Sequence, residues 1–220
     1  MDPKTMPKNN APRLWGVVYD VGLNYTGTGY SVHPFNLALV KHDMHVIATV
    51  LHATAIRIEG KEISRLVLAA QAAHEVGLAV YFNPWKMNAT AEETKEYLLE
   101  AAKAAEQLRS VDGADMIFLV GCECTIFSKG CFPGDDFAER VTWFGTQLSL
   151  ASESTLTNPP QAILDRSSNL NELLRLLVGA TKKHFRGPIS YSAGSWEKVD
   201  WSLFDIVGID HYRRGESAED

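Results

Sequence analysis

The chain has 220 residues, of which 45% are hydrophobic, and this suits one domain with a sizeable core. Its formal net charge of -6 argues against nucleic acid or an anionic membrane surface as a partner, because both require a basic face. The apolar runs are all shorter than the roughly 20 residues that span a bilayer. We therefore expect a cytoplasmic protein that binds neither nucleic acid nor a membrane.

The N-terminal segment and the cysteines are consistent with this compartment. Residues 1–13 are polar and rich in proline and lack the apolar centre of a signal peptide, so we expect a flexible lead before one domain that covers 14–220. The three cysteines, Cys122, Cys124 and Cys131, are an odd number in one short segment, which suits a reducing compartment rather than a disulfide framework. Their spacing matches no standard zinc pattern. The sequence therefore predicts free thiols, no bound metal and no cofactor.

Short apolar runs alternate with segments of helical period, which is typical of parallel strands joined by helices. Strands are expected at Leu14–Tyr19, Ala53–Ile58, Leu78–Phe82, Met116–Gly121, Pro188–Ser192 and Asp205–Ile209. Helices are expected at Pro34–Leu51, Glu62–Val76, Thr90–Arg109, Asp136–Leu150 and Leu170–His184. The first helix has a proline at its start, as helix entry prefers, and the third opens with a capping-box pattern. The stretch Ala151–Asn169 breaks the helical pattern and indicates a surface insertion.

Two architectures are compatible with this alternation, a closed barrel and an open doubly wound sheet. An open sheet with a dinucleotide site carries G-x-G-x-x-G directly after an early strand. Here Gly27 and Gly29 come too late after the first strand, and the third glycine is missing. We therefore predict an α/β fold of the TIM-barrel (β/α)8 type, with six parallel strand–helix units in this chain.

In a parallel barrel the chemistry lies at the carboxyl ends of the strands. Polar and aromatic residues follow every predicted strand: Tyr19 and Asp20, Arg57 and Glu59, Asn83 and Trp85, Glu123, Trp196 and Glu197, and finally Asp210, His211 and Tyr212. For any single one of these residues, its polarity is explained equally well by the exposure of loops to solvent. Loop polarity alone does not require the aromatic residues, which suit stacking on a ring compound. The sequence predicts Glu123, Asp210 and His211 as catalytic groups, and a substrate-binding set of Asp20, Arg57, Glu59, Asn83, Trp85, Trp196 and Tyr212.

Glu123 is the sharpest single signal, because it follows the apolar run Met116–Gly121 at a strand end. Strand alternation is expected to place its carboxyl group at the mouth of the barrel, where partial desolvation would raise its pKa toward the range of a general acid. A structural salt bridge, for example to Arg57, is the alternative. Arg57 lies inside an apolar strand, so we expect it to point into the mouth and hold a carboxylate. His211 is either a base or a hydrogen-bonding residue.

Three segments resemble a known group of enzymes. AIRIEG at Ala55–Gly60, FLVGCE at Phe118–Glu123 and FDIVGIDHY at Phe204–Tyr212 are similar to segments of the retaining (β/α)8 glycoside hydrolases of the endoglucanase and β-galactosidase type. More closely, the run Trp15–Tyr212 resembles bacterial and fungal proteins that carry the label abortive infection protein and share that barrel. This label names no biochemical function.

The resemblance to these hydrolases implies roles for three residues and also shows two departures. Arg57 would orient the nucleophile, Glu123 would be the acid/base, and Tyr212 would be the aromatic residue near the end of the sixth strand. The position before the acid/base is Cys122, where these hydrolases usually have an Asn that binds the sugar 2-hydroxyl. Their nucleophile is a Glu of the seventh strand, and this chain ends at Asp220, soon after the sixth.

The expected function follows from these departures. A retaining mechanism needs two carboxyl groups about 5–5.5 Å apart. We expect the complete protein to be a glycosidase-like enzyme for a sugar or another polyhydroxylated ring compound, and the present chain, without the last two units, to be inactive as a hydrolase. Open barrel edges would favour self-association. Two alternatives remain open: a lyase, isomerase or cyclase that reuses the barrel, and a binding or defence protein without catalysis.

Overall fold

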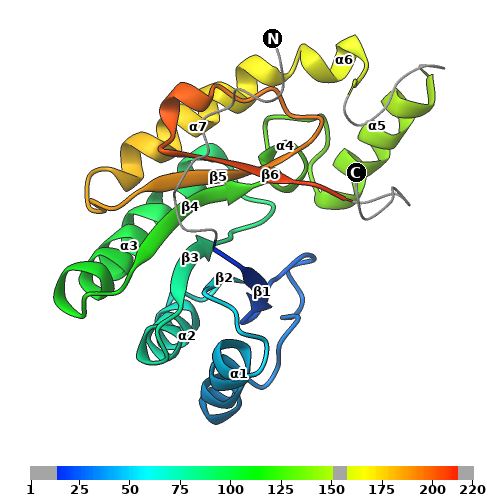
Figure 1. The fold of residues 1–220 in the computed structure, drawn as a ribbon. Coiled ribbons are helices and arrows are strands. Elements are labelled where there is room, and N and C mark those ends of the chain that lie inside the picture. Colours follow the sequence, from blue (N-terminus) through cyan, green and yellow to red (C-terminus); the bar gives the residue numbers. More distant parts are fainter. Residues whose placement is uncertain (1–13, 151–157, 213–220) are drawn as a thin grey trace, which may run out of the picture.

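The computed structural model describes residues 14–150 and 158–212, and in this part of the chain six strands form one parallel sheet. The strands are β1 (Gly16–Asp20), β2 (Ala55–Gly60), β3 (Ala79–Pro84), β4 (Met116–Cys122), β5 (Ile189–Gly194) and β6 (Ile206–Asp210). They pair in chain order from β1 to β6, and the sheet curls into half of a barrel (Figure 1). A doubly wound sheet would reverse its strand order at a switch point. The predicted TIM-barrel-like fold is therefore confirmed.

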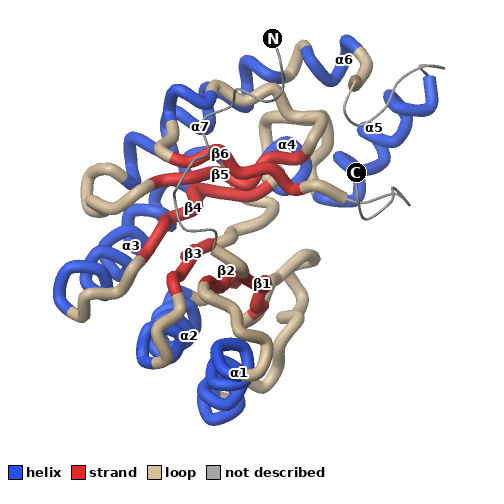
Figure 2. Tube along the Cα trace, viewed as in Figure 1, coloured by secondary structure: helices blue, strands red, loops and turns tan. Residues whose placement is uncertain are grey.

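Helices connect the strands and cover the outer face of the curled sheet. They are α1 (Leu37–Thr49), α2 (Ile63–Glu75), α3 (Ala91–Val111), α4 (Cys124–Phe127), α5 (Phe137–Leu150), α6 (Gln161–Leu164) and α7 (Ser167–Thr181), with a 3-10 turn, η2 (Trp201–Leu203), before β6. Figure 2 shows α1, α2, α3 and α7 on the outer side of the sheet. Among the described residues, no helix is both long enough and apolar enough to cross a membrane.

The main hydrophobic core lies between the outer face of the sheet and these helices. Alternate strand residues point into it, such as Ile56 and Ile58 of β2 and Val80 and Phe82 of β3, all of them fully buried. Because successive side chains of a strand point to opposite faces, the residues between them point to the inside of the curl. Arg57 lies between Ile56 and Ile58, so its side chain reaches the inside, as predicted.

Two helix starts differ from the sequence prediction. Helix α1 begins at Leu37 and not at Pro34, because the side chain of Asn36 accepts hydrogen bonds from the backbone nitrogens of Ala38 and Leu39 at 3.0 and 3.3 Å and so caps the helix. Helix α7 begins at Ser167, inside the expected insertion. An Asn at the cap position was a stronger start signal than a proline two residues earlier.

Parts of two domain predictions fall outside the described residues. The flexible lead at 1–13 and the first part of the expected insertion, 151–157, are not described. The remainder of the insertion contains helix α6 and the first turn of α7.

The capping box predicted for α3 is present. The side chains of Thr90 and Glu93 each accept a hydrogen bond from the backbone nitrogen of the other residue.

Strands β1 and β6 are the two ends of the sheet, and in the described part of the chain each has one side without a paired strand. Apolar side chains are exposed there: Val18 of β1 is 58% exposed, and Val207 and Ile209 of β6 are 61% and 52% exposed. Exposed apolar groups on an unpaired strand are unusual, because such edges promote association.

Candidate functional site

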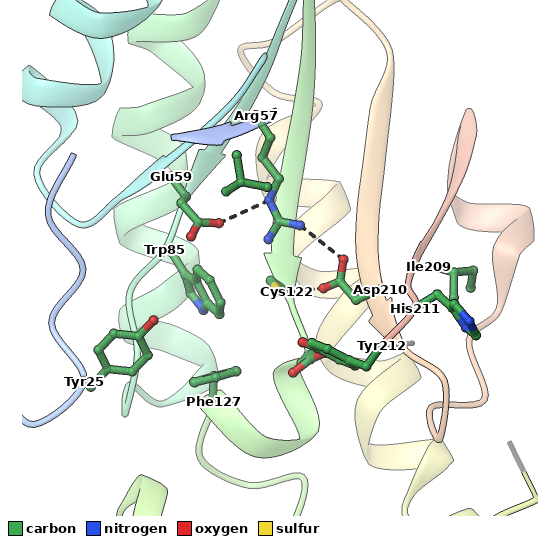
Figure 3. Close-up of a pocket in the computed structure, with 12 residues that line it drawn as sticks. Tyr25, Arg57, Glu59, Trp85, Cys122, Phe127, Ile209, Asp210, His211 and Tyr212 are labelled. Atoms are coloured by element: carbon green, nitrogen blue, oxygen red, sulfur yellow. Dashed lines mark hydrogen bonds and ion pairs between the residues drawn. The ribbon is translucent and has the colours of Figure 1, made fainter. Parts of the chain in front are cut away.

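A cavity of about 410 Å³ opens at the carboxyl ends of the strands. Its lining residues come from five of the six strands or the loops that follow them, and from α4; they are Val18, Tyr25, Arg57, Glu59, Trp85, Cys122, Glu123, Phe127, Ile209, Asp210, His211 and Tyr212. A volume of this size suits a small organic ligand. Figure 3 shows Arg57 at the base of the cavity, with Glu59, Trp85 and Tyr25 on one side and Asp210 and Tyr212 on the other.

Glu123 lies directly after β4 in an unusual backbone conformation. Its φ of 43° and ψ of 47° are left-handed, which is uncommon for a residue with a side chain and is typical of strained positions at functional sites. Its backbone nitrogen donates to the carbonyl oxygen of Ser192 at 2.8 Å, which ties the turn to β5. The residue is only 5% exposed, yet its carboxyl group reaches the cavity.

The hydrogen bond between Tyr212 and Glu123 brings the fourth and sixth strand ends together. The hydroxyl group of Tyr212 donates to Oε1 of Glu123 at 2.6 Å. Burial raises the pKa of Glu123 above its ordinary value, although the bond from Tyr212 and the charge of Arg57 act in the opposite direction. A carboxyl group of this kind holds its proton to higher pH than an exposed one, which is what a general acid requires.

Arg57 holds carboxylates, as predicted, but its partners are not Glu123. Its Nη1 donates to Asp210 at 3.2 Å and to the hydroxyl oxygen of Ser192 at 2.7 Å. Its Nε lies 3.3 Å from an oxygen of Glu59. The guanidinium group therefore links β2, β5 and β6 across the inside of the curl. The salt bridge to Glu123, which was the alternative explanation of that residue, is not formed, and Glu123 accepts a hydrogen bond from Tyr212 instead.

Asp210 is the most fully bonded carboxylate of the cavity. Besides Arg57, it accepts hydrogen bonds from Ser192 at 2.5 Å and from the Cys122 thiol at 3.2 Å. Burial raises the pKa of Cys122 well above its ordinary value, so this thiol keeps its proton and acts as a donor. All three cysteines of the chain are free and buried. Cys122 thus orients Asp210 from the position where the resembling hydrolases carry an Asn.

Four aromatic rings wall the cavity, and two of them were not predicted. Trp85 and Tyr212 were expected, whereas Tyr25 comes from the loop after β1 and Phe127 from the short helix α4. The rings of Trp85 and Phe127 meet edge to face with centroids 4.8 Å apart. The side-chain charge of Arg57 lies 5.9 Å from the Trp85 ring centroid. Flat aromatic surfaces next to hydrogen-bonding groups are the pattern of a site for a ring compound with polar substituents.

Three predicted binding residues do not line the cavity. Asp20 accepts hydrogen bonds from the backbone nitrogens of Gly22 and Leu23 at 2.6 and 3.1 Å, so it closes a turn. Trp196 is buried in a second hydrophobic cluster, where it packs on Phe144. Asn83 is fully buried. Of the predicted catalytic residues, His211 lines the edge, but Figure 3 shows its ring pointing away from Arg57.

Glu197 organises the turn that carries Glu123, although it was named only as a residue at a strand end and no role was predicted for it. One carboxylate oxygen accepts from the backbone nitrogen and the hydroxyl group of Thr125 at 3.0 and 2.6 Å. The other accepts from the Tyr191 hydroxyl group at 2.8 Å and the Gly194 nitrogen at 3.0 Å. These bonds fix the start of α4, directly after Glu123.

Within the residues that the structure describes, no group of three or more His, Cys, Asp or Glu side chains that could hold a metal ion is present.

Comparisons with known proteins agree with the fold. No family model matches the sequence, and no curated protein matches it either. Among solved structures, a GH113 beta-1,4-mannanase is similar with a TM-score of 0.51 and 12% identity, over 90% of this chain and 61% of that one. A GH113 beta-mannanase from Alicyclobacillus acidocaldarius is similar with a TM-score of 0.48 and 12% identity, over 89% of this chain and 59% of that one.

The class that these findings define is the glycoside-hydrolase-like barrel, at the level of the fold. The chain spans less than two thirds of the length of the mannanases that it resembles. Identity of 12% shows a shared fold and no shared activity.

Proposed function

We propose that the cavity binds a sugar or another polyhydroxylated ring compound and that Glu123 acts there as a general acid/base. One observation carries this proposal: Glu123 is buried directly after β4, and its side chain lines the cavity. The same burial raises the pKa of its carboxyl group above the ordinary value. A general acid must be protonated near the pH of the reaction and lie within reach of its substrate. Both conditions are supported by this arrangement.

The remaining walls of the cavity support a sugar-like ligand. The rings of Trp85 and Tyr212 offer surfaces for the apolar faces of a ring compound, and Arg57, Glu59 and Asp210 offer donors and acceptors for hydroxyl groups. The two solved structures named above are described as mannanases. For this reason β-1,4-linked manno-oligosaccharides are the first ligands to test.

The experiment combines binding and turnover. Manno-oligosaccharides and a panel of other sugars are titrated into the protein by calorimetry, and released reducing ends are measured in parallel. We expect Trp85→Ala to weaken binding. In the complete protein we expect Glu123→Gln to keep binding but lose most turnover, because the amide has the shape of the acid and no proton to give, whereas the present chain should bind sugar with little or no turnover. The matched control is Glu172→Gln on the exposed surface of α7. Absence of binding to every sugar, or full turnover by Glu123→Gln, contradicts the proposal.

The same measurements separate the other functions that the fold allows. Product formation without water incorporation would favour a lyase, isomerase or cyclase. Binding without any turnover would favour a binding or defence protein. We also propose a cytoplasmic location, which the three free cysteines support.

A further inference from the structure

We propose that this cavity is selective for a positively charged ligand, an amino sugar or another hydroxylated ring compound with a free amine. This inference rests on the proposed function and narrows its ligand class from ring compounds in general to aminated ones. The ammonium group of the ligand binds beside the carboxylate of Glu59, next to the aromatic rings that wall the same side of the cavity.

The residues that line the cavity carry more negative than positive groups. Three of them have carboxyl groups: Glu59, Glu123 and Asp210. Arg57 is the only lysine or arginine of this lining, within the part of the chain that the structure describes. Its Nη1 donates to Asp210 at 3.2 Å, so these two charges offset each other. The charge of Glu59 is then in excess even while Glu123 holds its proton, and such a cavity attracts cations and repels anions.

Glu59 offers the carboxylate to which an ammonium group can bind. Its contact with Nε of Arg57, at 3.3 Å, joins two charges without the alignment of a hydrogen bond. Burial is the main cause that raises the pKa of Glu59, and the carboxylates of Asp20 and Asp210 add to it. The charge of Arg57 and the amide of Asn83 act in the opposite direction without removing the rise. A cation beside Glu59 relieves this repulsion, because it stabilises the ionised carboxylate.

Three aromatic rings, Tyr25, Trp85 and Phe127, form a corner on the side of Glu59 (Figure 3). The ring centroids of Trp85 and Phe127 are 4.8 Å apart with an angle of 78° between the rings, and those of Tyr25 and Phe127 are 6.3 Å apart at 58°. Burial raises the pKa of the Tyr25 hydroxyl group, and the charge of Glu59 raises it further, so this carboxylate acts on the same corner. Steeply inclined rings next to a carboxylate suit an ammonium group, since each ring face presents negative charge density to a cation.

The rest of the cavity suits the hydroxylated part of the ligand. The cavity of about 410 Å³ is larger than a bare ammonium ion requires. Asp210 and Tyr212 lie opposite the aromatic corner in Figure 3 and offer acceptors and a ring face. A cation is already accommodated near the corner, because the guanidinium carbon of Arg57 lies 5.9 Å from the ring centroid of Trp85. The ligand class that uses both halves of the cavity is an aminated, hydroxylated ring.

The test compares ligands that differ only in their amines, by calorimetry with the full chain at a pH below the pKa of the sugar amines. D-mannosamine is compared with D-mannose, and a β-1,4-linked glucosamine tetrasaccharide with cellotetraose. We expect the aminated member of at least one pair to bind about tenfold more tightly than its neutral partner. This ratio equals about 1.4 kcal/mol, which is within the range of a cation held on aromatic faces. Tetramethylammonium, a cation without hydroxyl groups, should bind more weakly than that aminated sugar.

Variants show whether the selectivity comes from the aromatic corner. Glu59→Gln removes the charge, and Tyr25→Leu removes a ring face but keeps an apolar side chain. Each should lower the ratio of aminated to neutral affinity toward one. A partial loss of folded protein does not change this ratio, because it removes sites for both ligands equally. Glu172→Gln, on the exposed surface of α7, is the matched control and should keep the ratio of the wild type.

The outcomes separate this inference from the proposed function. Binding of neutral sugars, with no aminated partner bound more tightly, overturns the inference and leaves the proposed function intact. A ratio that persists in both Glu59→Gln and Tyr25→Leu overturns it as well, since the charge is then recognised elsewhere. Tetramethylammonium that binds as tightly as the amino sugars shows that no hydroxylated ring is recognised. If no sugar binds, neutral or aminated, both proposals are wrong.

Discussion

Replacement of Glu197 by Gln should remove a defined part of the pH dependence of stability. Burial raises the pKa of the Glu197 carboxyl group from its ordinary 4.5 to about 7, even though four donors from Thr125, Tyr191 and Gly194 act to lower it. Between pH 4.5 and 7 the folded protein therefore keeps a proton that the unfolded chain has released. The free energy of unfolding falls as pH rises through this window, because the folded state binds more protons.

The magnitude follows from the difference between the two pKa values. A difference of 2.5 between 4.5 and 7 corresponds to about 3 kcal/mol at 25 °C. Urea unfolding of the wild type and of Glu197→Gln, measured from pH 4 to 8, should give curves whose separation changes by about this amount. Glu59 and Glu123 also have raised pKa values, but they titrate in both proteins and cancel in the difference.

A constant offset is expected in addition, since the Gln amide leaves one or more donors unpaired at a cost of about 1–3 kcal/mol each. Glu172→Gln serves as the control for the removal of a carboxylate from the surface. Curves for wild type and Glu197→Gln that stay parallel from pH 4 to 8 would refute the assignment of a raised pKa to Glu197.

Three further predictions concern other parts of the molecule. Arg140→Met should lower the free energy of unfolding by on the order of 3 kcal/mol, because the fully buried guanidinium group donates to three oxygen atoms that would lose their partner; urea unfolding measures this. Tyr212→Phe removes a bond that favours the ionised form of Glu123, so the pKa of Glu123 should rise, as followed by carbon NMR of the labelled carboxyl group; an unchanged pKa contradicts the contact. We propose that the open β6 edge causes self-association; Val207→Lys with Ile209→Lys should reduce it in sedimentation, and a wild type that is monomeric at all concentrations contradicts this.

The fold was predictable because strands buried on one or both faces leave a strong signal in the sequence. Every residue of β4 is buried, and its apolar run was recognised to within one residue of its end. The same signal placed the other strands of the curl, and the alternation of strands and helices gave their parallel order. Helix starts were less predictable, since the cap of α1 depends on one side chain, Asn36, that competes with the nearby Pro34 as a start signal.

The candidate site was predictable only as a set of strand ends. Trp85 and Trp196 both follow strands, and nothing in the sequence distinguishes them. In the structure the Trp196 indole nitrogen donates to Thr125 at 3.0 Å within the second cluster, while Trp85 forms a wall of the cavity. Tyr25 and Phe127 reach the cavity through loop and helix packing, which leaves no local pattern. A sequence shows where a chain leaves the sheet, but not the direction in which the next side chain turns.

Glu123 was expected at the mouth of the barrel and lines the cavity there, but strand alternation explains its position only in part. Strand alternation was expected to carry its carboxyl group into the mouth, but the pairing of β4 with β5 shifts register between Leu119 and Cys122. This irregularity brings Cys122 into the cavity next to Glu123, which strict alternation forbids. The left-handed turn at Glu123 then directs its side chain, and Gly121 permits the turn, since an added Cβ would lie 2.6 Å from the sulfur of Cys124. Two neighbouring residues can thus face one ligand only because the strand ends in a bulge and a strained turn, and that geometry is held by contacts with β5 and Glu197, distant in sequence.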